Sequence, residues 1–98
     1  MSRDRGTQRQ KRDVCYGAVC DVDGKVTDGL LLTGANQEHG IVSRGDGGVE
    51  RDIVGRFPVG TLLRILPNHA CATGTQFPYY HAIGAQGGVQ TWRRFDGW

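Results

Sequence analysis

Glycine occupies 16 of the 98 positions, and this abundance constrains the fold more than any other feature of the sequence. Glycine weakens helices and supplies the positive φ angles that tight turns require. No window of the sequence carries the apolar repeat of a helix. The glycines do not follow the Gly-X-Y period of collagen, so a collagen triple helix is excluded. The sequence therefore predicts an all-β fold, a small antiparallel β domain that is curled or barrel-like.

Short β-prone segments alternate with turn residues from Val14 onward. Asp23-Gly24 predicts a two-residue hairpin loop. Pro67 ends the most convincing strand, because proline has no amide proton for the ladder. We expect Val49–Val54 to pair back as a strand and His69–Pro78 to form a loop. The expected strands are residues 14–20, 25–32 with a buried end at 30–32, 39–43, 61–66, 79–83 and 89–92.

Basic residues gather at the N-terminus. Residues 1–13 hold five basic and two acidic side chains, which gives a net charge of +3. Residues 14–98 hold seven basic and eight acidic side chains, which gives a net charge of −1. A nucleic-acid arm would need interleaved aromatic residues or a basic folded face, and neither is present. We therefore expect residues 1–13 to be a disordered basic leader, residues 14–98 to be the folded domain, and nucleic acid not to be a partner.

The sequence also predicts a cellular compartment. It has no apolar run of the ~18 residues that a membrane helix needs, and no signal-peptide core follows the N-terminal charges. An odd number of cysteines without a secretory signal does not favour a disulfide framework. Cys15 and Cys20 lie five positions apart in one expected strand, on opposite faces, so they should not pair. We expect a cytoplasmic protein without membrane contact.

His69 and Cys71 follow directly after the strand that Pro67 ends. In extended backbone, residues i and i+2 point to the same side, and imidazole with thiolate suits Zn²⁺. Two ligands are too few for a closed structural site but suit an open catalytic one. The alternative is that Cys71 is a small buried hydrophobic residue and His69 a hydrogen-bonding loop residue. The spacing alone leaves both readings open.

The residues around this pair carry a family resemblance. Pro67–Thr73 reads Pro-Asn-His-Ala-Cys-Ala-Thr. Together with the preceding Val59–Thr61 and Arg64–Leu66, it resembles the signature of the C-terminal β domain of the D-serine dehydratase and D-threonine aldolase family. Glu38–Val42 resembles an upstream motif of the same domain, and Thr91–Trp98 resembles its tail.

The resemblance covers about residues 15–98 and implies a fold-type III pyridoxal-phosphate (PLP) enzyme. Such enzymes join an alanine-racemase-like (β/α)₈ barrel, whose lysine holds the cofactor, to a small β domain. That domain gives a His and a Cys, or an Asp in aldolase relatives, to a divalent metal. By this match His69 and Cys71 are the metal ligands, and the cysteine favours zinc and the dehydratase side. His39 is then a candidate catalytic residue, with structural hydrogen bonding as the alternative.

The family's chemistry implies D-β-hydroxy amino acids as substrates. The metal would polarise the β-hydroxyl as a leaving group in dehydration, or orient it for deprotonation in retro-aldol cleavage, while PLP takes up the electrons. The barrel is missing from the chain, and neither Lys11 nor Lys25 stands beside a phosphate cradle. We therefore expect a severed or separately encoded second half that needs a barrel partner. The other hypothesis is a stand-alone, non-catalytic module that binds metal or a partner.

Overall fold

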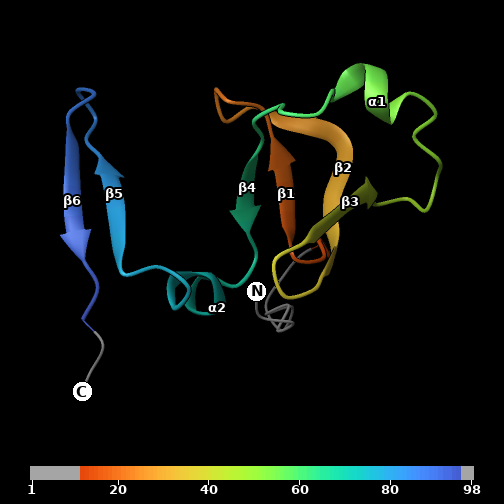
Figure 1. Ribbon diagram of the computed structural model, residues 1–98. Coiled ribbons are helices and arrows are strands. Elements are labelled where there is room, and N and C mark those ends of the chain that lie inside the picture. Colours follow the sequence, from red (N-terminus) through yellow and green to blue (C-terminus); the bar gives the residue numbers. More distant parts are fainter. Residues whose placement is uncertain (1–11, 96–98) are drawn as a thin grey trace.

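The structure, a computed structural model, describes residues 12–95 (Figure 1). The expected disorder of the leader and the end of the C-terminal motif therefore fall largely outside the described residues. Strands dominate the described part, and two short helices interrupt them. The elements are β1 (Gly17–Cys20), β2 (Val26–Ala35), β3 (Gly40–Arg44), α1 (Ile53–Arg56), β4 (Arg64–Pro67), α2 (Ala70–Gly74), β5 (Tyr79–Ile83) and β6 (Val89–Arg93).

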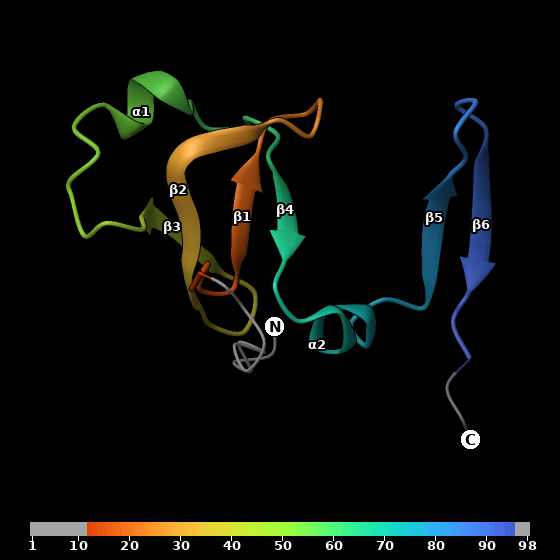
Figure 2. The same ribbon diagram turned by 180° about the vertical axis from the view of Figure 1, so that it is seen from behind.

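The strands form two separate antiparallel sheets. One has four strands in the order β3-β2-β1-β4, and the other is the hairpin β5-β6. Figures 1 and 2 show the hairpin standing apart from the larger sheet, with α2 between them. The all-β antiparallel prediction is confirmed. Barrel closure is not seen in the described residues, because the two outer strands of the sheet, β3 and β4, do not pair with each other.

The core lies on β1 and β2, the two inner strands. Leu30 and Leu32 alternate along β2 and are buried, as period-2 geometry requires. Val19 and Cys20 of β1 have no exposed surface, and Ala35 completes the buried set. The predicted buried end of the second strand is confirmed at Leu30 and Leu32. All three cysteines are free thiols.

The first hairpin loop is one residue longer than predicted. The amide of Asp21 donates to the carbonyl of Lys25 at 3.0 Å, so three residues, not two, form the loop between them. Gly24 has a φ of 84°, as expected where a three-residue loop ends in a left-handed residue. The Asp21 carboxylate accepts bonds from the amides of Asp23 and Lys25, which stabilises this longer loop.

Two segments predicted as strand or loop are helical, and both predictions were wrong. Val49–Val54 does not pair back. Instead the Asp52 carboxylate accepts a 3.1 Å bond from the amide of Gly55 and caps α1. His69–Pro78 contains α2, because the amides of Thr73 and Thr75 find carbonyl partners within the segment.

The expected strand 61–66 begins only at Arg64, where pairing with β1 starts. Within residues 12–95, neither helix has the length and apolar run needed to cross a membrane.

An ion pair closes the turn after β3. The Arg44 guanidinium donates to both Asp46 carboxylate oxygens, at 3.1 and 2.6 Å, and the Gly48 amide donates at 2.9 Å. These bonds lower the pKa of Asp46 from 3.8 to about 2, with the Arg44 bond the largest cause. A carboxyl whose folded pKa is lowered stabilises the fold above its unfolded pKa, and loses that contribution as pH falls toward the folded one.

We therefore expect the wild type to lose a little more stability than Asp46→Asn between pH ~5 and pH ~2. The difference should be small because the Asp46 side chain is exposed and Arg44 is only half-buried, so solvent screens the pair. Urea midpoints of the two chains at both pH values measure it. Arg44→Gln should behave like Asp46→Asn. Equal acid-induced losses in wild type and Asp46→Asn would contradict the assignment.

Candidate metal-bearing site

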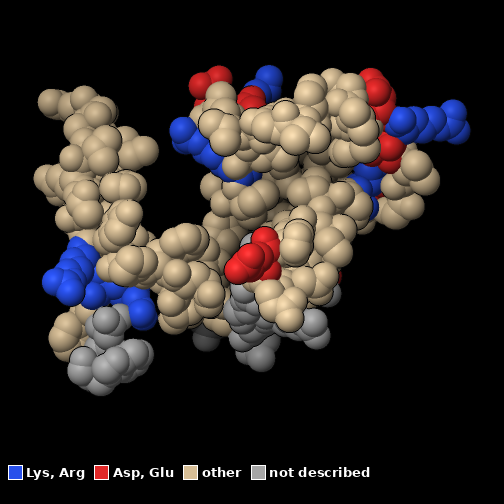
Figure 3. Space-filling model, viewed as in Figure 1, with Lys and Arg blue, Asp and Glu red and all other residues tan. Residues whose placement is uncertain are grey.

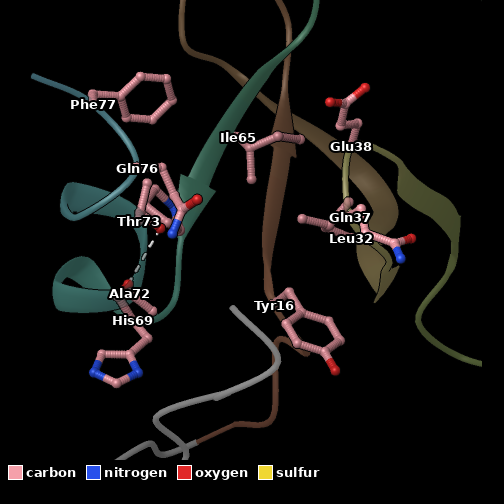
Figure 4. A pocket seen from close by; sticks show the side chains of 11 residues that line it. Tyr16, Leu32, Gln37, Glu38, Ile65, His69, Ala72, Thr73, Gln76 and Phe77 are labelled. Atoms are coloured by element: carbon pink, nitrogen blue, oxygen red, sulfur yellow. Dashed lines mark hydrogen bonds between the residues drawn. The ribbon is translucent and has the colours of Figure 1, made fainter. Parts of the chain in front are cut away.

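A groove of about 460 Å³ runs between α2 and the four-stranded sheet (Figure 4). It brings together three parts of the chain that are far apart in sequence: the residue before β1, the strand β2 with the loop that follows it, and the segment from β4 to Phe77 after α2. Its lining residues are Tyr16, Leu32, Gln37, Glu38, Ile65, Pro67, His69, Ala72, Thr73, Gln76 and Phe77.

The groove combines an apolar floor with a few polar side chains at its edges. Leu32 and Ile65 come from the sheet, and Phe77 follows α2. Figure 4 shows Glu38 on the opposite side of the groove from Gln76. An apolar concave surface with a small number of polar groups is the usual composition of a ligand site.

His69 lies at the junction of β4 and α2. Its backbone is extended, with φ −119° and ψ 96°, and it is the N-cap residue of α2. Its carbonyl accepts bonds from the amide and the hydroxyl of Thr73, each at 3.2 Å. Figure 4 shows the imidazole at the end of the groove, pointing away from Gln37 and Glu38. The predicted ligand therefore borders the groove rather than occupying its centre.

Cys71 lies one residue inside α2, and it is exposed. The expectation that His69 and Cys71 project from one extended segment was wrong, because the backbone turns helical at Ala70. The reading of Cys71 as a buried hydrophobic residue is also not what the structure shows. Within residues 12–95, no group of three or more His, Cys, Asp or Glu side chains is arranged to hold a metal ion. A metal here would have at most two protein ligands from the described residues.

His39 is exposed and is absent from the groove lining. Its carbonyl accepts a 2.9 Å bond from the amide of Asn36, which closes the turn between β2 and β3. This turn presents the neighbouring Gln37 and Glu38 to the groove instead. The catalytic role of His39 stays a prediction.

Sequence reasoning assigned no role in a site to the polar groove residues Tyr16, Gln37, Glu38 and Gln76. Glu38 carried a usable signal, because it opens the motif that contains His39. The others stand in segments whose contact with the groove depends on tertiary folding.

The described residues do not fit PLP. Schiff-base chemistry needs a lysine held beside a phosphate cradle. Lys25 is the only lysine between residues 12 and 95. It lies exposed at the loop between β1 and β2 and does not line the groove. Lys11 lies outside the described residues.

Comparison with known proteins identifies relatives over the whole chain. D-threo-3-hydroxyaspartate dehydratase from Delftia sp. is 67% identical over 98 residues, which are 100% of this chain and 26% of that protein. Its structure superposes with a TM-score of 0.86. D-serine dehydratase of Saccharomyces cerevisiae is 42% identical over 41 residues, 41% of this chain and 10% of that protein.

Further solved structures agree. An alanine-racemase-like protein from Idiomarina loihiensis is 47% identical, with a TM-score of 0.80 over 100% of this chain and 25% of its own. Two structures are alanine variants of a D-threo-3-hydroxyaspartate dehydratase, each 66% identical to this chain. One replaces a histidine and the other the cysteine two positions later, and the cysteine variant is in the metal-free form.

The chain spans about a quarter of the length of the Delftia dehydratase, and it corresponds to the C-terminal part of that enzyme. A family model described as "Putative serine dehydratase domain" matches residues 1–83, which is most of the chain. The chain therefore belongs to the serine dehydratase domain family.

Proposed function

We propose that this chain is the metal-carrying C-terminal domain of a PLP-dependent dehydratase that acts on D-β-hydroxy amino acids. The observation that carries the proposal is the identity of 67% along the whole chain to D-threo-3-hydroxyaspartate dehydratase. The names of this relative and of the yeast relative both favour dehydration over aldol cleavage. Of the two reactions expected from the sequence, dehydration is therefore better supported than aldol cleavage.

His69 and Cys71 are the proposed metal ligands. In this sequence only His69 is followed two positions later by a cysteine. The spacing equals that of the histidine and cysteine replaced in the two variants of D-threo-3-hydroxyaspartate dehydratase, and the structure of the cysteine variant shows a metal-free form. The short helix α2 keeps Cys71 exposed next to the half-buried His69, so an open site remains accessible to substrate.

The donor set of one imidazole and one thiolate favours zinc among divalent metals. When bound, the metal would supply Lewis-acid polarisation of the substrate's β-hydroxyl. The groove beside it offers Tyr16 and Glu38 as polar groups to orient a substrate, and Leu32, Ile65 and Phe77 as walls that exclude water. We propose a reducing compartment such as the cytoplasm, because an exposed thiol ligand persists there.

The partner is proposed to be a PLP-binding (β/α)₈ barrel, supplied as a domain or a separate chain. Arg64 and Arg93 enclose a stretch without a single Asp, Glu, Lys or Arg. Besides most of β4 and all of α2, this stretch includes nearly all of the exposed hairpin, where Ile83, Val89 and Trp92 are 68%, 63% and 59% exposed. Figure 3 shows the upper hairpin free of charged side chains. An exposed apolar surface without charges is typical of an interaction site.

A zinc titration of the isolated chain tests the metal site. We expect wild type to bind one Zn²⁺, and His69→Ala and Cys71→Ala to lose binding, because each removes one of only two protein ligands. Isothermal titration calorimetry measures this directly. Circular dichroism should show that both variants keep the β fold, because neither side chain belongs to the core.

Matched controls exist for both ligand types. His81→Ala removes an imidazole from the exposed face of β5, and Cys20→Ala removes a thiol from the core of β1. Both variants should keep the zinc affinity of wild type. Equal binding by wild type and Cys71→Ala would show that the ligands are misassigned.

A further inference from the structure

A strained turn lies directly before β1. Cys15 has a φ of 56°, and it is the only non-glycine residue with positive φ in the described range 12–95. Such a conformation costs free energy and persists only where the surroundings enforce it. The Asp13 carboxylate accepts a 2.8 Å bond from the Cys15 amide, and the Gly17 amide donates to the Val14 carbonyl at 3.0 Å. The turn is thus held in this shape by bonds on both sides.

Asn68 connects this turn to the candidate metal site. Its side-chain amide donates to the carbonyl of Cys15 at 2.9 Å, in a partly buried contact that spans 53 positions. Its backbone amide donates to the carbonyl of Tyr16, also at 2.9 Å. The next residue is His69, the N-cap of α2, and Cys71 follows inside the helix. The strained turn therefore accepts two bonds from the residue that precedes the first proposed ligand.

We propose that Asn68 is a positioning residue for the metal site, and that the turn from Val14 to Gly17 is the platform to which it fixes the start of α2. This inference rests on the proposed function. The helix has only five residues and no side-chain cap at its N-terminus. Such a short helix does not set its own direction, so the direction must come from contacts at its ends. Asn68 provides the contact at the end that carries His69 and Cys71.

The far end of α2 has a comparable contact. The Tyr80 hydroxyl donates to the carbonyl of Gly74 at 2.8 Å. This bond ties the end of α2 to the hairpin, just as the two Asn68 bonds tie the segment before α2 to the turn that precedes β1. Loss of the Asn68 side-chain bond should therefore loosen the first turn of α2, while Tyr80 still holds the last.

The variant Asn68→Asp gives the sharpest test. It has nearly the same shape, but its carboxylate cannot donate to the Cys15 carbonyl and repels it instead. It also adds a negative charge beside the proposed ligands, so electrostatics alone would strengthen zinc binding. We expect the opposite result, a zinc affinity that falls about tenfold, the equivalent of one lost hydrogen bond.

A second readout needs no metal. The amides of Thr73 and Thr75 form the hydrogen bonds of α2. In Asn68→Asp they should exchange with solvent about tenfold faster, while amides of the β1–β2 pair keep their wild-type rates. Asn36→Asp is the matched control. It makes the same chemical change at an exposed turn residue outside the groove, and it should leave both readouts unchanged.

The outcomes separate the two claims. If Cys71→Ala loses zinc but Asn68→Asp keeps wild-type affinity and exchange rates, the role of Asn68 is overturned and the proposed function stands. If wild type binds no zinc, both are overturned. Faster exchange throughout the chain in Asn68→Asp would show a general structural role and would also overturn the inference.

Discussion

The 98-residue chain alone, supplied with PLP and Zn²⁺, should release no ammonia from D-threo-3-hydroxyaspartate or D-serine above the background of the free cofactor. Covalent catalysis by PLP depends on an activated lysine and on a site that orients the cofactor. The described residues offer only Lys25, which stands exposed at a loop outside the groove. The metal site by itself has nothing to take up the electrons of the broken bond.

A coupled assay for ammonia and 2-oxo acid measures this prediction, with a full-length dehydratase of the family as the positive control. Lys25→Arg tests the one lysine among the described residues, because it keeps the charge but cannot form a Schiff base. Turnover by the purified chain that disappears in Lys25→Arg would contradict the account, and it would make the chain an enzyme in its own right.

Much of the β architecture could be predicted because its signals are local. The apolar run at the end of the second expected strand, residues 30–32, predicts a buried segment, and Leu30 and Leu32 are core residues while Leu31 is half-buried. The last hairpin follows from two β-prone segments around a glycine turn, and the structure pairs Tyr79 with Arg93 and Ile83 with Val89. Whether the sheet closes was beyond the sequence, because closure depends on which outer strands meet.

The surroundings of the candidate site were harder to predict. The helix α2 is too short to show a period, and its ends are held by Asn68 and Tyr80, which contact it from outside the helix. The groove unites Glu38 and His69 through packing of distant segments. The motif around His69 and Cys71 was visible, but the helical turn that begins between them at Ala70 was not.

The central claim is that this chain serves as the metal-bearing quarter of a dehydratase, and a chimera tests it. In the chimera this chain replaces the C-terminal quarter of the Delftia D-threo-3-hydroxyaspartate dehydratase, to which it is 67% identical. The chimera should dehydrate D-threo-3-hydroxyaspartate, because the domain that this chain replaces has a closely similar sequence and fold.

Cys71→Ala in the chimera should lower kcat/KM at least about a hundredfold, the scale expected when Lewis-acid stabilisation is lost. Cys71→Asp should recover part of the rate, because a carboxylate oxygen also ligates divalent metals. The decisive measurement is therefore kcat/KM of the chimera with Cys, Ala and Asp at position 71, together with the metal content of each protein. We predict an active, an inactive and a partly active enzyme, with metal lost only in the alanine variant. An active, metal-free Cys71→Ala chimera would contradict the account.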